Sequence, residues 1–340
     1  MARHPFHDVA VVGVFNTTQA RVLEGHDSRS ITMEASLGAI ATGLASTVLI
    51  SAGSAGLYTD RSSTAPWTRP SNEFVAPFGM FTAAEFALIA RRHMEMYGTT
   101  PEALATVAAT IRNNGHVHPD AVYRGRGPFT VQDILDSRMV ADPFHLLDCS
   151  MTAEGGCALV LTTADRARDL PHDPVFVLGG NTDHFGPAYQ HPPAWDLGGN
   201  VRPDLVAGTV GRRAAEMSFA MCGLGPEDVD VCEFYDPFSF EIIRQFEAFG
   251  FCGPGEGGDF VMDGNIGPGE RYPITTDGGL MSFSHGGAVV QLLQRVIRGV
   301  EQLRHECVTM QVPDAEVALC SGGGAGALFN DVLLLGRHRP

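Results

Sequence analysis

Residues 278–287 read Gly-Gly-Leu-Met-Ser-Phe-Ser-His-Gly-Gly, and residues 319–324 read Leu-Cys-Ser-Gly-Gly-Gly. In both stretches a strand pattern gives way to glycines, which is a usual setting for a chemically exposed side chain. His285 and Cys320 occupy these positions, and side chains of these types can act as an acid, a base or a thiolate nucleophile near neutral pH. The chain therefore carries a candidate acid–base pair in its second half.

Strand and helix patterns alternate outward from these two stretches. A helix is expected at 287–304, where apolar residues recur at helical spacing, and strands are expected at 316–320 and 327–335 on either side of a glycine turn. The other expected strands are at 9–14, 46–51, 157–163, 175–178 and 228–234, and the other expected helices are at 30–44, 82–97, 101–113, 130–138, 207–222 and 239–249. This alternation predicts an α/β protein of layered type.

The alternation falls into two successive halves. Residues 168–174 are polar and contain prolines, which predicts a boundary between a first half at 1–170 and a second half at 171–340. The first half contains a loop region at about 52–150, which includes helices of its own.

Composition limits the function further. The 340 residues are 44% apolar and 18% charged, and the formal charge of −16 argues against nucleic acid or an anionic membrane as the main partner. No apolar run approaches the length of a membrane span, and the first eight residues lack the core of a signal peptide. The seven cysteines show no CxxC spacing, which predicts free thiols in the cytoplasm and no metal site.

Each of the two candidate residues has a second interpretation. His285 precedes the expected helix, whose positive end favours a neutral imidazole, but a half-buried histidine bonded to a turn carbonyl fits equally. Cys320 precedes Gly322, and the backbone N–H groups of these glycines could hold an oxyanion, but a buried apolar cysteine is common. Ser284 and Gly286 flank His285 as supporting residues, because glycines nearby allow a substrate to approach closely.

A second polar motif lies between an expected strand and an expected helix. Pro237 suits the first helical turn and Asp236 suits its cap, so these two residues can be structural. Tyr235 is not needed for the helix and could donate a proton or a hydrogen bond. Residues 113–118 (Asn-Asn-Gly-His-Val-His) lack the spacing of metal ligands and are expected to form a solvated loop.

Several long motifs stand in one order along the chain: residues 137–149, 235–258, 273–287 and 320–326. Together they resemble the thiolase superfamily, in the branch of sterol-carrier-protein thiolases and lipid-transfer-protein aldolases. The resemblance extends from about residue 81 to the C-terminus. It implies a thiolase-like fold of two similar layered halves, with a helical loop region inserted in the first.

The resemblance also implies roles for individual residues. His285 matches the histidine that activates the nucleophile and helps to bind the thioester oxygen. Cys320 matches the cysteine that moves the proton at the α-carbon, and the N–H of Gly322 matches an oxyanion-hole donor. Tyr235 stands where thiolases have an asparagine that holds a catalytic water, and a tyrosine here resembles the steroid side-chain aldolases of the family.

The first half departs from the family pattern. Thiolases carry the acyl group on a cysteine of the first half, whereas this chain has no cysteine before Cys149. The chain passes from the strand at 9–14 through one helix to the strand at 46–51, so the first half is expected to be shortened. His26, Asp27 and Ser30 are the polar residues near the start of that helix, and none is a credible acyl carrier.

Three functions remain open. The first, which an intact His285 and Cys320 favour, is a thiolase-like acyltransferase that makes or breaks a C–C bond next to an acyl-CoA thioester. The second is a retro-aldolase of β-hydroxyacyl-CoA, which needs no covalent carrier. The third is a non-catalytic subunit that binds acyl-CoA or lipid.

The resemblance also implies partners. They are acyl-CoA as the substrate with no bound cofactor, a second copy of the chain in a homodimer formed through the first half, and a small protein with a zinc ribbon and an OB fold.

Overall fold

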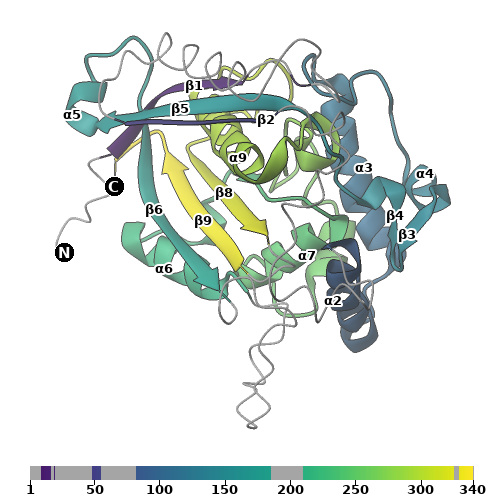
Figure 1. Ribbon diagram of the computed structural model, residues 1–340. Helices are drawn as coiled ribbons and strands as arrows, with labels where there is room; N and C mark the ends of the chain where they lie inside the picture. The colour runs from purple at the N-terminus through teal and green to yellow at the C-terminus, as the bar shows by residue number, and fades with distance from the viewer. Residues whose placement is uncertain are drawn as a thin grey trace, which may run out of the picture.

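A seven-stranded sheet forms the centre of the protein, in the order β2-β5-β1-β6-β9-β8-β7 (Figure 1). The structure is a computed structural model and describes residues 9–16, 19, 48–54, 82–184, 210–324 and 329–339. The strands are β1 (Val9–Asn16), β2 (Val48–Ser54), β5 (Gly155–Thr163), β6 (Val175–His184), β7 (Val231–Glu233), β8 (Val317–Gly324) and β9 (Phe329–Gly336). The sheet confirms the predicted α/β class.

The two halves of the sequence share this sheet. β1 pairs antiparallel with β5 on one side and with β6 on the other, so strands from both halves are joined by backbone hydrogen bonds. β7 and β8 run parallel, and the other neighbouring strands are antiparallel. Of the described strands in this sheet, three come from the predicted first half and four from the second. The boundary near residue 170 stays a prediction.

Helices cover both faces of the sheet (Figure 1). α9 (Gly287–Arg304) crosses one face, because Val290, Ile297, Val300 and Leu303 form a buried apolar stripe along it. α6 (Arg212–Cys222) packs on the opposite face against β6 and β9. The helix predicted at 287–304 is therefore confirmed in both its bounds and its buried face.

The loop region lies at one end of the sheet (Figure 1). It contains α2 (Thr82–Tyr97), α3 (Pro101–Val117), α4 (Val131–Asp136), the ribbon of β3 (Met139–Ala141) and β4 (Phe144–His145), and the short helix η5 (Leu146–Asp148). Thr100 caps α3, and its hydroxyl accepts a hydrogen bond from the Ala103 N–H at 3.3 Å. The remaining elements are α5 (Ala164–Ala167), η7 (Pro226–Asp228), α7 (Ser239–Ala248), α8 (Gly257–Met262) and η8 (Gly279–Phe283).

Two local predictions were wrong. β8 continues through Gly322 and Gly323, which were expected in a turn, because both glycines pair with β9. Leu292 and Tyr235 pack against these glycines, where a larger residue would not fit. Residues 113–117 of the expected solvated loop instead form the end of α3, with His118 as its C-cap, and Asn114 is buried with its amide donating to the Ile274 carbonyl at 3.0 Å. The predicted helix at 30–44, with His26, Asp27 and Ser30, lies outside the described residues.

Candidate active site

The candidate residues lie at one edge of the sheet. β7 and β8 are parallel, so their carboxyl ends meet at the same edge, where Tyr235 lies just after β7 and Gly322 and Gly323 lie near the end of β8. Residues 273–275 run beside β7, since the Cys232 N–H donates to the Pro273 carbonyl at 3.0 Å and the Thr275 N–H donates to the Cys232 carbonyl at 2.9 Å. The stretch that leads to His285 therefore leaves the sheet near Tyr235.

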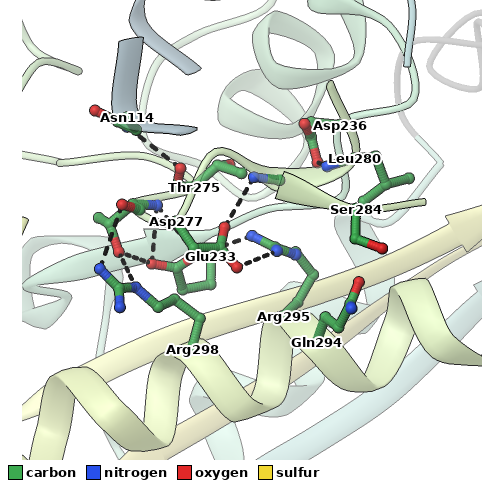
Figure 2. A network of polar contacts seen from close by, with 12 residues as sticks. Asn114, Glu233, Asp236, Thr275, Asp277, Leu280, Ser284, Gln294, Arg295 and Arg298 are labelled. Carbon is green, nitrogen blue, oxygen red and sulfur yellow. Dashed lines mark hydrogen bonds and ion pairs between the residues drawn. The ribbon is translucent and has the colours of Figure 1, made fainter. Parts of the chain in front are cut away.

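Asp236 holds the turn that precedes His285. Its two carboxyl oxygens accept hydrogen bonds from the N–H groups of Leu280 at 2.9 Å and Met281 at 3.1 Å (Figure 2). The prediction that Asp236 caps the following helix was wrong, because α7 begins at Ser239 without a side-chain cap and the carboxyl group faces the turn instead. Gly279 is required here: its φ is 57°, and a Cβ would overlap the Asp236 carboxyl. Burial raises the pKa of Asp236 to about 7.

Residues 150–153 pair with both Pro237 and the His285 turn. The N–H groups of Ser150, Met151 and Ala153 donate to the carbonyls of Pro237 at 2.8 Å, Leu280 at 3.2 Å and His285 at 3.0 Å, respectively. The Ser150 hydroxyl lies 3.1 Å from His285 Nδ1. Ser150 was not predicted, because it lies 135 residues from His285.

His285 is uncharged near neutral pH. The side chain is half-buried, and burial lowers its pKa to about 4 against the opposing effects of hydrogen bonds with the Met151 backbone and the Gln291 side chain. A neutral imidazole was expected from the helix end, and in the structure burial is the first cause of the lowered pKa. Its neighbours Ser284 and Gly286 are structural supports: the Ser284 hydroxyl donates to Gln19 Oε1 at 2.6 Å, and Gly286 is the residue before α9.

Arg112 of α3 ties these segments together. Its buried guanidinium donates to the carbonyls of Leu147 at 2.7 Å, Cys149 at 2.8 Å and Met281 at 2.9 Å. These carbonyls lie on both chain segments that hold His285. Arg112 was not predicted as a site residue. Its place directly after Ile111, in an apolar stretch of the expected helix, is a signal from which a buried arginine could have been predicted.

A buried ion network underlies the turn (Figure 2). Arg295 of α9 donates to Glu233 at 3.1 Å and to Asp277 at 2.6 Å, and all three side chains are almost fully buried. Arg298 donates to the hydroxyl of Thr276 at 2.8 Å, and this hydroxyl donates to Glu233 at 2.6 Å. The network joins the end of β7, residues 275–277 and α9.

Tyr235 presents a phenol without a partner in the described part of the chain. Its ring packs against Gly323, where a Cβ would lie 2.8 Å from Tyr235 Cδ1. Its N–H donates to the Ser321 hydroxyl at 2.8 Å, and its carbonyl accepts from the Gln245 amide at 2.7 Å. The phenol hydroxyl forms no hydrogen bond with any described residue. Burial raises the pKa of the phenol above its usual value near 10, so Tyr235 stays protonated at neutral pH.

Cys320 faces away from Tyr235. Alternate residues of β8 point to opposite faces of the sheet, so Ser321 and Gly323 face Tyr235 while Cys320 and Gly322 face α9. A Cβ at Gly299 would lie 2.6 Å from the Cys320 sulfur, and Gly299 is about 18 Å along α9 from the helix start next to His285. This placement does not favour an acid–base couple of His285 with Cys320.

No cysteine in this chain is set up as a thiolate. All seven lie among the described residues, none forms a disulfide, and each has its pKa raised, with burial as the first cause. Across the described ranges, no group of three or more His, Cys, Asp or Glu residues could hold a metal ion. No helix in the same ranges is long and apolar enough to cross a membrane.

Comparisons with known proteins agree with these features. Residues 198–337 match the family model for the thiolase C-terminal domain. The chain is 36% identical over 234 residues to a steroid side-chain-cleaving aldolase of Thermomonospora curvata, covering 66% of this chain and 57% of that protein. It is also 36% identical over 262 residues to a 17-hydroxy-3-oxo-4-pregnene-20-carboxyl-CoA lyase of Mycobacterium tuberculosis, covering 76% and 64%.

Further relatives belong to the same superfamily. An acetyl-CoA acetyltransferase of Methanothermobacter thermautotrophicus is 34% identical, with 76% of this chain and 64% of that protein covered. The chain thus spans 57 to 64% of the length of these three curated relatives. A solved structure of an Ltp2-ChsH2(DUF35) aldolase has a TM-score of 0.81 and 25% identity, with 98% of this chain and 99% of that chain covered. The chain belongs to the thiolase superfamily, in the branch of sterol-carrier-protein thiolases and lipid-transfer-protein aldolases.

Proposed function

We propose that this protein is a retro-aldolase that cleaves a β-hydroxyacyl-CoA thioester. The observation that carries the proposal is Tyr235, whose hydroxyl lacks a partner among the described residues and whose ring is fixed against Gly323. A phenol that stays protonated at neutral pH can donate its proton to a reacting group. The similarity to a steroid side-chain-cleaving aldolase and a steroid carboxyl-CoA lyase supports the same reaction class.

The proposed reaction divides the proton transfers between two residues. Neutral His285 accepts the proton of the β-hydroxyl, the bond between the α- and β-carbons breaks, and the β-carbon leaves as a ketone or aldehyde. The electron pair moves to the thioester as an enolate. Tyr235 gives a proton to the α-carbon, and the proton on His285 then restores the phenol. The N–H of Gly322 remains the proposed donor to the enolate oxygen.

An acyltransferase reaction is supported less well. It needs a thiolate to carry the acyl group, and burial raises the pKa of every cysteine of this chain. Cys320 faces α9 rather than Tyr235. The similarity to an acetyl-CoA acetyltransferase is the observation in favour of this second candidate.

Product analysis separates the candidates. Incubation with a β-hydroxyacyl-CoA should release a ketone or aldehyde together with a shortened acyl-CoA, without free CoA. A mass shift of the protein by one acyl group would instead support the acyltransferase. Binding of acyl-CoA without either result would support a non-catalytic subunit. The Tyr235→Phe variant should lose cleavage while still binding acyl-CoA, and unchanged turnover would contradict the role given to Tyr235.

We propose the same partners as the family implies. The name of the Ltp2-ChsH2(DUF35) aldolase has two components, which supports a partner subunit here. The resemblance to the family implies that this partner is a small protein with a zinc ribbon and an OB fold. A homodimer through the first half and a cytoplasmic location complete the proposal, with acyl-CoA as substrate and no bound cofactor. Light scattering during gel filtration, with and without a co-expressed partner, tests the assembly.

A further inference from the structure

Asn330 is a buried amide without a partner. It lies in β9, its side chain is fully buried, and neither Oδ1 nor Nδ2 forms a hydrogen bond with another described residue. Buried side-chain amides in native proteins almost always have a partner, so an unsatisfied one needs a specific explanation. Both the donor and the acceptor of this amide are available.

Asn330 shares a face of the sheet with Tyr235. It pairs directly with Gly323 of β8, and residues that pair in this way have Cβ positions about 5 Å apart on the same face. The Tyr235 ring packs on the Cβ side of Gly323. The Tyr235 ring and the Asn330 side chain therefore both adjoin Gly323 on the same face of the sheet.

Gly211 and Phe249 also lie beside Asn330. A Cβ at Gly211 would lie 3.3 Å from Asn330 Nδ2 and 2.8 Å from the Phe249 ring. The N–H of Gly211, just before α6, already donates to Asp183 at 3.0 Å, so Asn330 is not needed to cap this helix. The unpaired amide of Asn330 and the phenol of Tyr235, next to the Phe249 ring, are polar groups of the kind that orient a small organic ligand among apolar residues.

The chemistry of the site selects a neutral ligand group. Asp183 pairs with Asn330 across β6 and β9, and its carboxyl group disfavours an anion near the amide. In the bound substrate a hydroxyl matches both free atoms, because its oxygen accepts from Nδ2 and its proton donates to Oδ1, and this proton turns from Oδ1 to His285 when cleavage begins. A ketone or an ether would satisfy only the donor.

We propose that Asn330 binds the β-hydroxyl of the substrate beside Tyr235 and so selects hydroxylated acyl-CoA thioesters over those without the hydroxyl. This inference rests on the proposed retro-aldolase function and names the residue that recognises the reacting group. Glycine at 323 is part of the same arrangement, because a side chain there would displace Tyr235.

Calorimetric titration tests the proposal with two probes, a β-hydroxyacyl-CoA and the matching acyl-CoA without the hydroxyl. The wild-type protein should bind the hydroxylated probe more tightly. Asn330→Leu, which keeps the volume and removes both polar atoms, should weaken binding of this probe about 10- to 100-fold and leave the other probe unchanged. Asn181→Leu is the control, because Asn181 is a partly exposed asparagine of β6 whose amide donates to Met217.

A structural role alone predicts a different result. Equal affinity of the wild-type protein for both probes, or an unchanged preference in Asn330→Leu, would overturn the proposal. If Asn330→Leu does not fold, Asn330→Ala is tested instead, by the same ratio of affinities for the two probes. Cleavage assays separate the two proposals. If the hydroxyl preference depends on Asn330 but the protein releases no ketone or aldehyde, only the retro-aldolase function is contradicted. Unchanged cleavage by Asn330→Leu would contradict only the role of Asn330.

Discussion

Replacement of Arg112 by alanine should loosen the candidate site and the fold together. The guanidinium makes three hydrogen bonds to main-chain carbonyls on the two segments that hold His285. It also lies 4.7 Å from the centre of the Tyr123 ring. In the described part of the chain, no other side chain donates to these three carbonyls. The alanine variant therefore leaves the three carbonyl oxygens without this donor.

The expected loss of stability follows from these contacts. Removing a buried, charged donor and orphaning its acceptors costs about 3–5 kcal/mol. For a chain of this size about 1 kcal/mol corresponds to roughly 2 °C, so the melting temperature should fall by roughly 6–10 °C. Arg112→Lys should recover only part of the loss, because one ammonium group cannot reproduce the planar, forked geometry of the guanidinium.

Thermal unfolding followed by circular dichroism measures this loss, and cleavage of a β-hydroxyacyl-CoA below the melting temperature measures the effect on the site. Arg92→Ala is the control, because Arg92 is exposed on α2. Activity of Arg112→Ala should fall at temperatures where the variant is still folded. A melting temperature within about 2 °C of the wild-type value would refute the reasoning.

Three further predictions concern the same site. Ser150→Ala should lower kcat about 10-fold or more and shift its pH profile, with Ser150→Thr restoring both, because the hydroxyl orients His285; unchanged kinetics would exclude this role. Burial raises the pKa of Asp236 to about 7, so the folded state binds more protons than the unfolded state between about pH 4 and pH 7. Stability should therefore fall as pH rises through that window, and melting curves of Asp236→Asn should show a shallower slope. Arg295→Met should lower the free energy of unfolding by about 3–5 kcal/mol in urea titrations, because the carboxyl groups of Glu233 and Asp277 stay buried without their cation. A loss below about 1 kcal/mol would contradict this.

The sequence predicted those parts of the fold that depend on local patterns. The helix at 287–304 was predicted with the correct bounds because its apolar residues recur at helical spacing along one buried stripe. Tyr235 was singled out because Asp236 and Pro237 were expected to account for the start of the helix, although α7 begins at Ser239 and Asp236 does not cap it. The face of the sheet on which the Cys320 side chain lies was not predictable. The sequence pattern does not tell which alternate residues of β8 face α9.

Residues that act across long separations could not be found in this way. The roles of Arg112, Ser150 and Asn330 depend on neighbours at least 35 residues away or in another strand, and no spacing in the sequence marks such pairs. Asp236 was placed correctly between a strand and a helix, yet its partner is the turn at 279–281 rather than α7. Local capping rules name a plausible acceptor, and the tertiary packing decides which N–H groups it receives.

The pairing of β1 with β6 has a practical consequence for anyone who divides this chain. The partners Ala10 with Phe176 and Val11 with Val175 lie on either side of the predicted boundary near residue 170. Separate expression of the two parts would leave each with an uncovered strand edge, and such edges recruit other chains. The parts should therefore aggregate when produced alone and recover a soluble complex when produced together.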